Sequence, residues 1–472
     1  MMMFAWVSAT NCSRIYNMAL GDKDGLRELG LQWKNVMKMD MENVWEAFHI
    51  HSLLIDQISL GEFHSQNQPL SLPHKDATQR LDRFVGALQA RNIRFSDYHR
   101  PHYNHVCDGC SKVVERDGTM SLIRSAVMDG VTLGRPCCAV HDCKGSLSSP
   151  KRRYCPDHQE LEGICATIGC DNPIRPGFKT CNRPECIQVE ELYKEEGLAM
   201  KKFKERLERQ KGHISVVHDP LLTAALGFTT DGQVDSVQPD DEVEVEIMSG
   251  SHPEDGMDID KSGKEPQARA TCTGKSDGHQ KRLKARFGRK RTFCEELVVL
   301  SCGIVIGRTT FYGSEAPNGV VTFWEHLFPT PQSVPTFMWY DNNCHVKKIL
   351  RNEPEHRLNQ VALPVDVFHF KTKHKDNDKF CGEHCNPILW PELRDGDKWT
   401  FNSSAAEQVN AWIGGFLAMV REMREENCAF FLDEMLRRRN EYRIGELDRK
   451  GMQPKHINMD ILMEGWDSYS PL

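Results

Sequence analysis

Apolar residues recur at helical spacing in the first part of the chain. This spacing predicts helices within residues 25–60 and over residues 81–90, so that residues 1–100 form a helical N-terminal region. Further along, residues 187–210 are polar and charged but carry an apolar stripe. We therefore expect a surface helix over residues 191–215.

Shorter apolar runs follow a different pattern in two other parts of the chain. Within residues 101–190 they are brief and β-prone, and Arg116-Asp117-Gly118 and Met128-Asp129-Gly130 are turn signals between them. From about Glu295 strand-like runs alternate with helical ones, which predicts an α/β domain over residues 281–440 and a tail over 441–472. The expected elements are strands at 297–300, 303–306, 336–340 and 365–370, and helices at 320–328 and 405–439.

Residues 229–276 lack the apolar content of a folded segment. Acidic residues, Gly, Ser and Pro dominate them, so we expect a disordered linker over residues 216–280. The linker ends at a basic run, residues 281–291. Such a run can contact a phosphate backbone, act as a nuclear import signal, or simply be a solvated linker end. Its cationic residues are Lys281, Arg282, Lys284, Arg286, Arg289, Lys290 and Arg291.

Composition narrows the class of protein. The 472 residues leave room for about two to four domains, and a net charge of −7 excludes a histone-like basic polymer. No run approaches the roughly 20 apolar residues that span a bilayer, and the first residues lack a basic signal-peptide region. We therefore expect no membrane contact and no secretion, and a nuclear or otherwise cytoplasmic location.

Cysteine is concentrated in one stretch. Of 18 cysteines, ten lie between Cys107 and Cys186, and clustered pairs in a protein that is not secreted favour zinc over disulfides. Four pairs fill two tetrahedral structural sites. The simple division is Cys138, Cys143, Cys155 and His158, then Cys165, Cys170, Cys181 and Cys186; an interleaved division fits the spacing equally well.

A third zinc site is also predicted. Cys107 and Cys110 form a further close pair, which Cys137 would complete together with His141, His105 or His102. The chain is therefore expected to hold two to three structural Zn²⁺ ions.

These motifs resemble a known family. Pro136–Cys143, Tyr154–His158 and the Cys165–Cys186 segment are similar to the cysteine clusters associated with fungal KDZ (Kyakuja–Dileera–Zisupton) transposases. Four later motifs are similar to the transposase part of the same proteins, so that the resemblance covers roughly residues 40–445. They are Tyr340–Cys344, Asp366–Phe370, His384–Pro387 and Phe401–Gln408.

The resemblance implies a ribonuclease-H-like core in which three acidic residues hold Mg²⁺. Asp341, at a strand end, corresponds to the second acid and Glu407 to the third. The expected opening strand, Leu300–Ile304, carries no carboxylate, and Glu315 is the nearest acidic residue downstream. The resulting fold class is multidomain α+β: a helical N-terminal region, a zinc-stapled cluster, a disordered linker and a degenerate ribonuclease-H-like domain.

Three functions follow as hypotheses. The first is a transposon-derived zinc protein that binds DNA through the cysteine cluster and the basic run, with a degenerate catalytic core. The second is an active transposase that cuts DNA with two metal ions, in which Glu315 or another residue supplies the missing acid. The third is a zinc-dependent scaffold that binds protein or RNA. The presence of a third carboxylate beside Asp341 and Glu407 would favour the active transposase over the degenerate core.

Overall fold

The chain folds into two compact units in the computed structural model. The described residues are 2–20, 39–59, 72–73, 82–116, 118–195, 242–246, 282–372 and 378–464. Unit 1 comprises residues 1–137, 141–150 and 291–472, and unit 2 comprises residues 138–140 and 151–290. The later α/β domain was predicted to begin at residue 281, but its sheet also takes strands from residues 111–131, within the segment expected to belong to the cysteine cluster.

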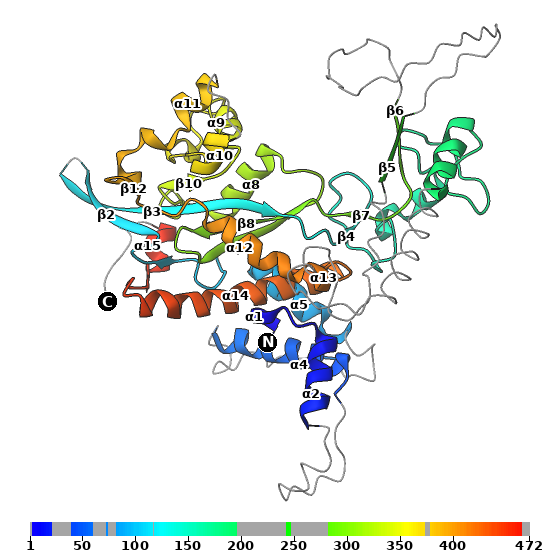
Figure 1. Ribbon diagram of the computed structural model, residues 1–472, viewed down its shortest axis with the longest axis horizontal. Coiled ribbons are helices and arrows are strands. Elements are labelled where there is room, and N and C mark those ends of the chain that lie inside the picture. Colours follow the sequence, from blue (N-terminus) through cyan, green and yellow to red (C-terminus); the bar gives the residue numbers. More distant parts are fainter. Residues whose placement is uncertain are drawn as a thin grey trace, which may run out of the picture. The chain divides into compact units, whose positions relative to one another are not determined.

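A five-stranded sheet organises unit 1 (Figure 1). Its strands run in the order β10-β3-β8-β9, and β2 pairs with the first half of β3. β3 is antiparallel to β2 and β8 but parallel to β10. The strands are β2 (Ser111–Arg116), β3 (Thr119–Val131), β8 (Cys294–Leu300), β9 (Val305–Phe311) and β10 (Phe337–Trp339).

Successive side chains along these strands point to opposite faces of the sheet, and both faces are buried. On one face Met128 and Val298 pack against α8 and α9, while on the other Val127 and Val299 pack against α12 and α14. In Figure 1 the long helix α14 runs below the sheet and α8 lies above it. The helices are α8 (Pro317–Leu327), α9 (Asn343–Leu350), α12 (Ala405–Ile413), α13 (Leu417–Val420) and α14 (Glu425–Arg449).

The N-terminal region is helical, as predicted, and packs on α14. Phe84 and Leu88 join Phe430 of α14 in a small apolar cluster. Beside it, the Arg91 guanidinium donates to Glu434 Oε2 at 2.8 Å, and both side chains are almost fully buried. The helices in this region are α1 (Met2–Ala5), α2 (Ala9–Leu20), α4 (Met41–Ser59) and α5 (Val85–Arg94).

Asp433 of α14 anchors a buried charge cluster. Arg100 donates to it at 2.7 Å, and Arg308 of β9 donates from Nε at 2.7 Å and from Nη2 at 2.9 Å. Burial by itself would raise the pKa of Asp433, but the two guanidinium groups hold it below its usual range. This cluster ties the sheet, α14 and the N-terminal region together.

The segment predicted to be a tail, residues 441–472, is largely structured. α14 continues to Arg449, and the buried side chains of Leu447 and Leu462 belong to the core on the α8 face. Strand β13 (Lys455–His456) pairs antiparallel with β1 (His105–Val106), and α15 spans Met459–Glu464.

One predicted strand is a helix. Residues 365–370 were predicted to form a strand, but α10 spans Val367–Thr372. Asp366 precedes it, and its Oδ1 accepts hydrogen bonds from the backbone N–H groups of Phe368 and His369 at 2.9 and 3.1 Å. These hydrogen bonds cap the first turn and favour a helix here over the predicted strand. The remaining short elements of unit 1 are α11 (Lys379–His384), β11 (Arg394–Asp395) and β12 (Lys398–Trp399).

Unit 2 is built on short elements. Its 3-10 segment η2 spans Pro156–Gly163, and residues 184–195 are helical. The surface helix was expected over 191–215, and residues 196–215 of that prediction lie outside the described residues. Most of the predicted linker lies outside the described residues. Residues 242–246, however, form strand β5 (Glu242–Glu246), which pairs antiparallel with β6 (Arg282–Arg286) and sets Glu244 opposite Lys284. The chain's other two-residue strands are β4 (Pro136–Cys137) and β7 (Lys290–Arg291).

Among the described residues, no helix is both long enough and apolar enough to cross a membrane.

Candidate metal centres

Two acidic residues lie at equivalent positions on neighbouring parallel strands, Asp129 within β3 and Asp341 just after β10. In the parallel pair, Trp339 of β10 lies opposite Val127 of β3. Asp341 follows Trp339 by two residues and Asp129 follows Val127 by two, so the two carboxylates lie at equivalent positions at the same edge of the sheet. Asp129 was not among the predicted site residues.

Helix α12 brings the third acid to this edge. Glu407 lies in its first turn, and Asn410, one turn later, donates from Nδ2 to Asp129 Oδ2 at 2.9 Å. The imidazole Nδ1 of His369 lies 2.8 Å from Asp341 Oδ1 and 3.6 Å from Glu407 Oε1. One histidine ring therefore connects the second and third predicted acids.

Negative charge accumulates around Asp129. Burial, and then the neighbouring Asp341 carboxylate, raise the pKa of Asp129 from 3.8 to about 6. On β8 the fully buried Glu296 has a pKa raised to about 8, by burial first and then by Glu315 and Asp129. Anionic carboxylates are thus disfavoured here unless a cation joins them.

The donor set fits a hard divalent cation. Asp366, His369 and Glu407 place one ligand atom each within 4.8 Å of one another. Asp366 Oδ2 is buried and has no hydrogen-bond partner within the described part of the chain. Carboxylate oxygens of this kind are what Mg²⁺ and Mn²⁺ prefer.

The position of Asp129 explains why sequence reasoning missed it. Met128-Asp129-Gly130 was predicted to be a turn, but all three residues lie inside β3. Gly130 is there for a packing reason, because a Cβ at this position would lie 2.4 Å from Glu296 Oε1 on β8. The usable signal was the short apolar run Ala126–Met128 leading directly into Asp129, the same strand-then-acid pattern that marked Asp341.

Glu315, the acid proposed as a substitute, has another partner. Its Oε1 accepts a hydrogen bond from the Tyr340 hydroxyl at 2.6 Å. Cys302, in the segment where the first acid was expected, belongs to a cysteine group described below.

Four cysteines of unit 2 form one buried group. Their sulfur atoms lie within 4.8 Å of one another, and Cys170 Sγ is 3.7 Å from Cys181 Sγ. The loop is closed by a hydrogen bond from the Cys165 N–H to the Asn172 carbonyl at 2.9 Å. The structure thus joins the last two predicted pairs as in the simple division, in a group made of Cys165, Cys170, Cys181 and Cys186.

Three of the four predicted ligands of the other zinc site lie close together within unit 2. His158 Nδ1 lies 3.2 Å from Cys155 Sγ and 3.6 Å from Cys138 Sγ. The Ala139 N–H donates to the Arg153 carbonyl at 2.8 Å, which holds the two ligand segments side by side. Cys143, the fourth predicted ligand, lies in segment 141–150, which clusters with unit 1.

Cys107 and Cys110 lie with a different pair of residues from the one expected. His105, one of three histidines proposed, lies beside them, and the fourth member is Cys302, more than 190 residues further along. Cys137 does not belong to this group, nor do His102 and His141.

A smaller group lies on α9 and at the start of α11. Cys344, Asp378 and Cys381 place one ligand atom each within 4.8 Å of one another. Cys385 joins Cys344 and Cys381 in a buried cluster.

Much of the basic run is used within the protein. Arg286 Nη1 donates to the Ala139 carbonyl at 2.7 Å, and Lys290 Nζ to the Val140 carbonyl at 3.5 Å. Arg291 donates to the Gly134 carbonyl at 2.8 Å and pairs with Glu422 at 2.9 Å. Lys281 lies outside the described residues. Cations with these bonds have a structural role regardless of nucleic acid.

Comparison with known proteins identifies one part of the chain. A family model described as a CxC6-like cysteine cluster associated with KDZ transposases matches residues 127–192. No curated protein and no solved structure matches the chain. The matched segment contains all eight of the paired ligand candidates from Cys138 to Cys186. Residues 127–192 therefore carry a cysteine cluster of the type associated with KDZ transposases.

Proposed function

We propose that unit 1 is the DNA-cleaving core of a KDZ-type transposase, and that Asp129, Asp341 and Glu407 are its catalytic acids. The observation that carries this proposal is the register of β3 and β10, which aligns Asp129 with Asp341. It favours the active enzyme over the degenerate core, because the acid that sequence analysis lacked now has a candidate.

The sheet topology supports a ribonuclease-H-like assignment. The central strand β3 has an antiparallel pair, β8 and β9, on one side and the parallel strand β10 on the other, with α12 packed against the sheet. The acids then follow in the order strand, strand end and helix, as expected for such a core. In this reading the cysteine cluster is inserted between the first and second strands of the core.

The proposed chemistry is phosphodiester hydrolysis or transfer. Two bound Mg²⁺ ions would activate the attacking oxygen and stabilise the leaving one. Asp129 and Asp341, on adjacent strands, would hold the shared metal position, and Glu407 would bind from the helix. His369, which pairs with Asp341, would orient that carboxylate.

The two sites that the sequence pairs predict within the cysteine cluster are proposed to hold structural Zn²⁺, each with four protein ligands. Four protein ligands per ion leave no open position for water, so these sites would stabilise the fold rather than catalyse. The association of the matched cluster with transposases supports DNA as the partner and the nucleus as the location.

A strand-cleavage assay tests the catalytic proposal. Purified full-length protein is incubated with supercoiled plasmid and Mg²⁺ or Mn²⁺, and nicked product is measured. We expect cutting that falls by at least about 100-fold in Asp129→Asn, Asp341→Asn and Glu407→Gln, because each removes an anionic metal ligand. Glu315→Gln is the matched control and should retain activity.

Two results would contradict this assignment. Activity that survives Asp129→Asn but is lost in Glu315→Gln would make Glu315 the first acid. Absence of both cutting and Mn²⁺ binding by the natural protein would support the degenerate core instead.

A further inference from the structure

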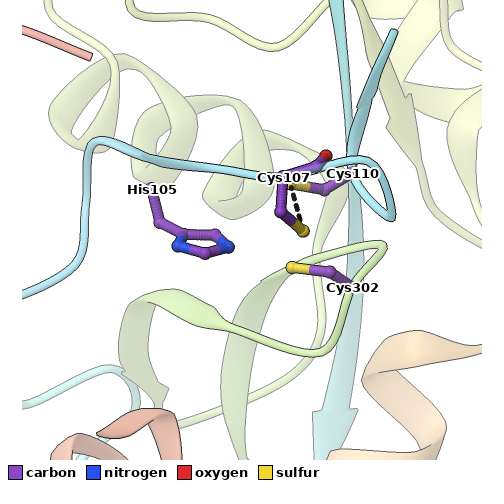
Figure 2. A group of neighbouring side chains, drawn as sticks. All are labelled: His105, Cys107, Cys110 and Cys302. Atoms are coloured by element: carbon purple, nitrogen blue, oxygen red, sulfur yellow. Dashed lines mark hydrogen bonds between the residues drawn. The ribbon is translucent and has the colours of Figure 1, made fainter. Parts of the chain in front are cut away.

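Four side chains from distant parts of unit 1 converge at the end of the sheet (Figure 2). His105 comes from β1, Cys107 and Cys110 from the turn before β2, and Cys302 from the turn between β8 and β9. Their ligand atoms lie within 4.8 Å of one another. All four are buried, with exposed fractions of 4% or less.

The distance between the sulfur atoms matches two ligands of one metal ion and is too long for a disulfide bond. Cys107 Sγ lies 3.7 Å from Cys110 Sγ. A disulfide bond is about 2.0 Å long. Two thiolates at about 2.3 Å from one tetrahedral zinc ion are about 3.8 Å apart.

His105 provides an independent sign of a missing partner. The residue is 2% exposed, yet neither Nδ1 nor Nε2 has a hydrogen-bond partner among the described residues. Leaving a buried polar atom without a hydrogen-bond partner is unfavourable. In Figure 2 the ring points toward the sulfur atoms of Cys107 and Cys302, where a bound ion would satisfy one nitrogen.

The backbone holds both ligand turns in place. The Cys107 carbonyl accepts from the N–H groups of Cys110 and Ser111 at 3.0 and 2.9 Å, which forms a tight turn. Gly109 in this turn allows close approach, since a Cβ there would lie 3.1 Å from Cys302 Cβ. On the other side, Arg443 Nε donates to the Cys302 carbonyl at 2.9 Å.

We propose that His105, Cys107, Cys110 and Cys302 bind a structural Zn²⁺ ion within the sheet-containing unit. Three thiolates and one imidazole form a closed, soft donor set that selects zinc and rejects Mg²⁺. Three of the ligands lie before residue 127 and the fourth at 302, so the site lies outside the segment that matches the cysteine-cluster family. It does not depend on the proposed catalytic function.

The ion would connect two turns of the sheet next to β3. Leu300, two residues before Cys302, pairs with Ala126 of β3, three residues before Asp129. Cys110 lies next to Ser111, where β2 begins its pairing with β3. Zinc here would therefore lock the β8–β9 turn to the β2–β3 hairpin.

Metal content of the full-length protein tests the site. Cys302→Ser should lose one equivalent of zinc relative to the natural protein, with the remaining zinc retained. Cys428→Ser is the matched control, because Cys428 is equally buried but belongs to none of the cysteine groups found among the described residues. Unchanged zinc content in Cys302→Ser would overturn the proposal.

A second measurement on the natural protein covers the case in which Cys302→Ser does not fold. Thiol alkylation is followed by peptide mass spectrometry before and after a zinc chelator is added. Cys107, Cys110 and Cys302 should become reactive together after chelation, at least tenfold faster than before. Equal reactivity of Cys302 with and without the chelator would refute the site, as would a Cys107–Cys110 disulfide in freshly purified protein.

Discussion

Replacing Asp129 by asparagine should stabilise the metal-free protein while abolishing its response to metal. The side chains are nearly the same shape, but asparagine keeps only one of the two acceptor oxygens, of which Oδ2 accepts from Asn410 and Oδ1 from the Gly130 N–H. The change also removes one negative charge from an edge of the sheet that Asp341 and Glu407 also occupy.

The pKa of Asp129 sets the size of this effect. It is raised from 3.8 to about 6, and at about 1.4 kcal/mol per pH unit the anionic side chain is disfavoured by about 3 kcal/mol at neutral pH. Because the amide must also be buried, we expect a gain of about 1–3 kcal/mol in the free energy of unfolding.

The pH dependence has a definite sign. A carboxyl group whose pKa is raised in the folded state destabilises that state fully above about pH 6. The difference between natural protein and variant should therefore be largest above pH 6, shrink as the pH falls toward 3.8, and vanish below it.

Thermal unfolding with and without Mn²⁺ measures both effects. Without metal, Asp129→Asn should raise the melting temperature, by about 2–4 °C for each kcal/mol in a unit of this size. With Mn²⁺ at 100 times the dissociation constant, the natural protein should gain about 2.7 kcal/mol and the variant much less.

A variant that is less stable than the natural protein without metal would contradict this prediction, as would equal stabilisation of both proteins by Mn²⁺. Glu315→Gln serves as the control, since it removes an acid whose hydrogen-bond partner is Tyr340. It should leave the Mn²⁺ response unchanged.

Three other predictions follow from buried or basic groups. Burial lowers the pKa of His49 to about 4, so the free energy of unfolding should fall by up to about 3 kcal/mol as the pH drops from 6.5 to 4. Urea titrations across that pH range should show a smaller fall for His49→Phe. Asp433→Asn should lower the free energy of unfolding by about 3–5 kcal/mol in the same titrations, because it leaves the Arg100 and Arg308 guanidinium groups without their shared carboxylate. A loss below about 1 kcal/mol would show that the buried charge cluster does not stabilise the fold. If the basic run contacts DNA, neutralising Lys284 and Arg289 should lower the salt-dependence slope of duplex binding by about two, whereas an unchanged slope would exclude them as phosphate contacts.

What the sequence revealed was local. Close pairs such as Cys165 and Cys170 can be predicted because their spacing alone brings the ligands together. Asp341 can be predicted because it follows an apolar strand. Apolar periodicity predicted the helical N-terminal region and helices at 320–328 and 405–439, where the structure has α8 at 317–327 and, in place of one long helix, α12, α13 and α14 between 405 and 449.

What the sequence concealed depended on pairing between distant segments. Asp129 reaches Asp341 only through the β3–β10 register, and Cys302 reaches Cys107 only through the β3–β8 pairing. Nothing within a short window encodes either register. The Asp129-Gly130 dipeptide even favours the wrong structure, because the same two residues are typical of a turn.

The antiparallel pairing of β3 with β8 has a consequence for how much chain the sheet can accommodate. Val131 lies opposite Glu295, and residues 132–293 leave and return at these neighbouring positions. Closing a loop of roughly 160 residues costs only about 3 kcal/mol more than closing a turn of about four, and doubling it again would add about 0.6 kcal/mol. The strand junction is therefore an entropically inexpensive place to exchange one module for another, and an unrelated folded domain grafted in place of residues 151–290, which belong to unit 2, should leave the sheet intact.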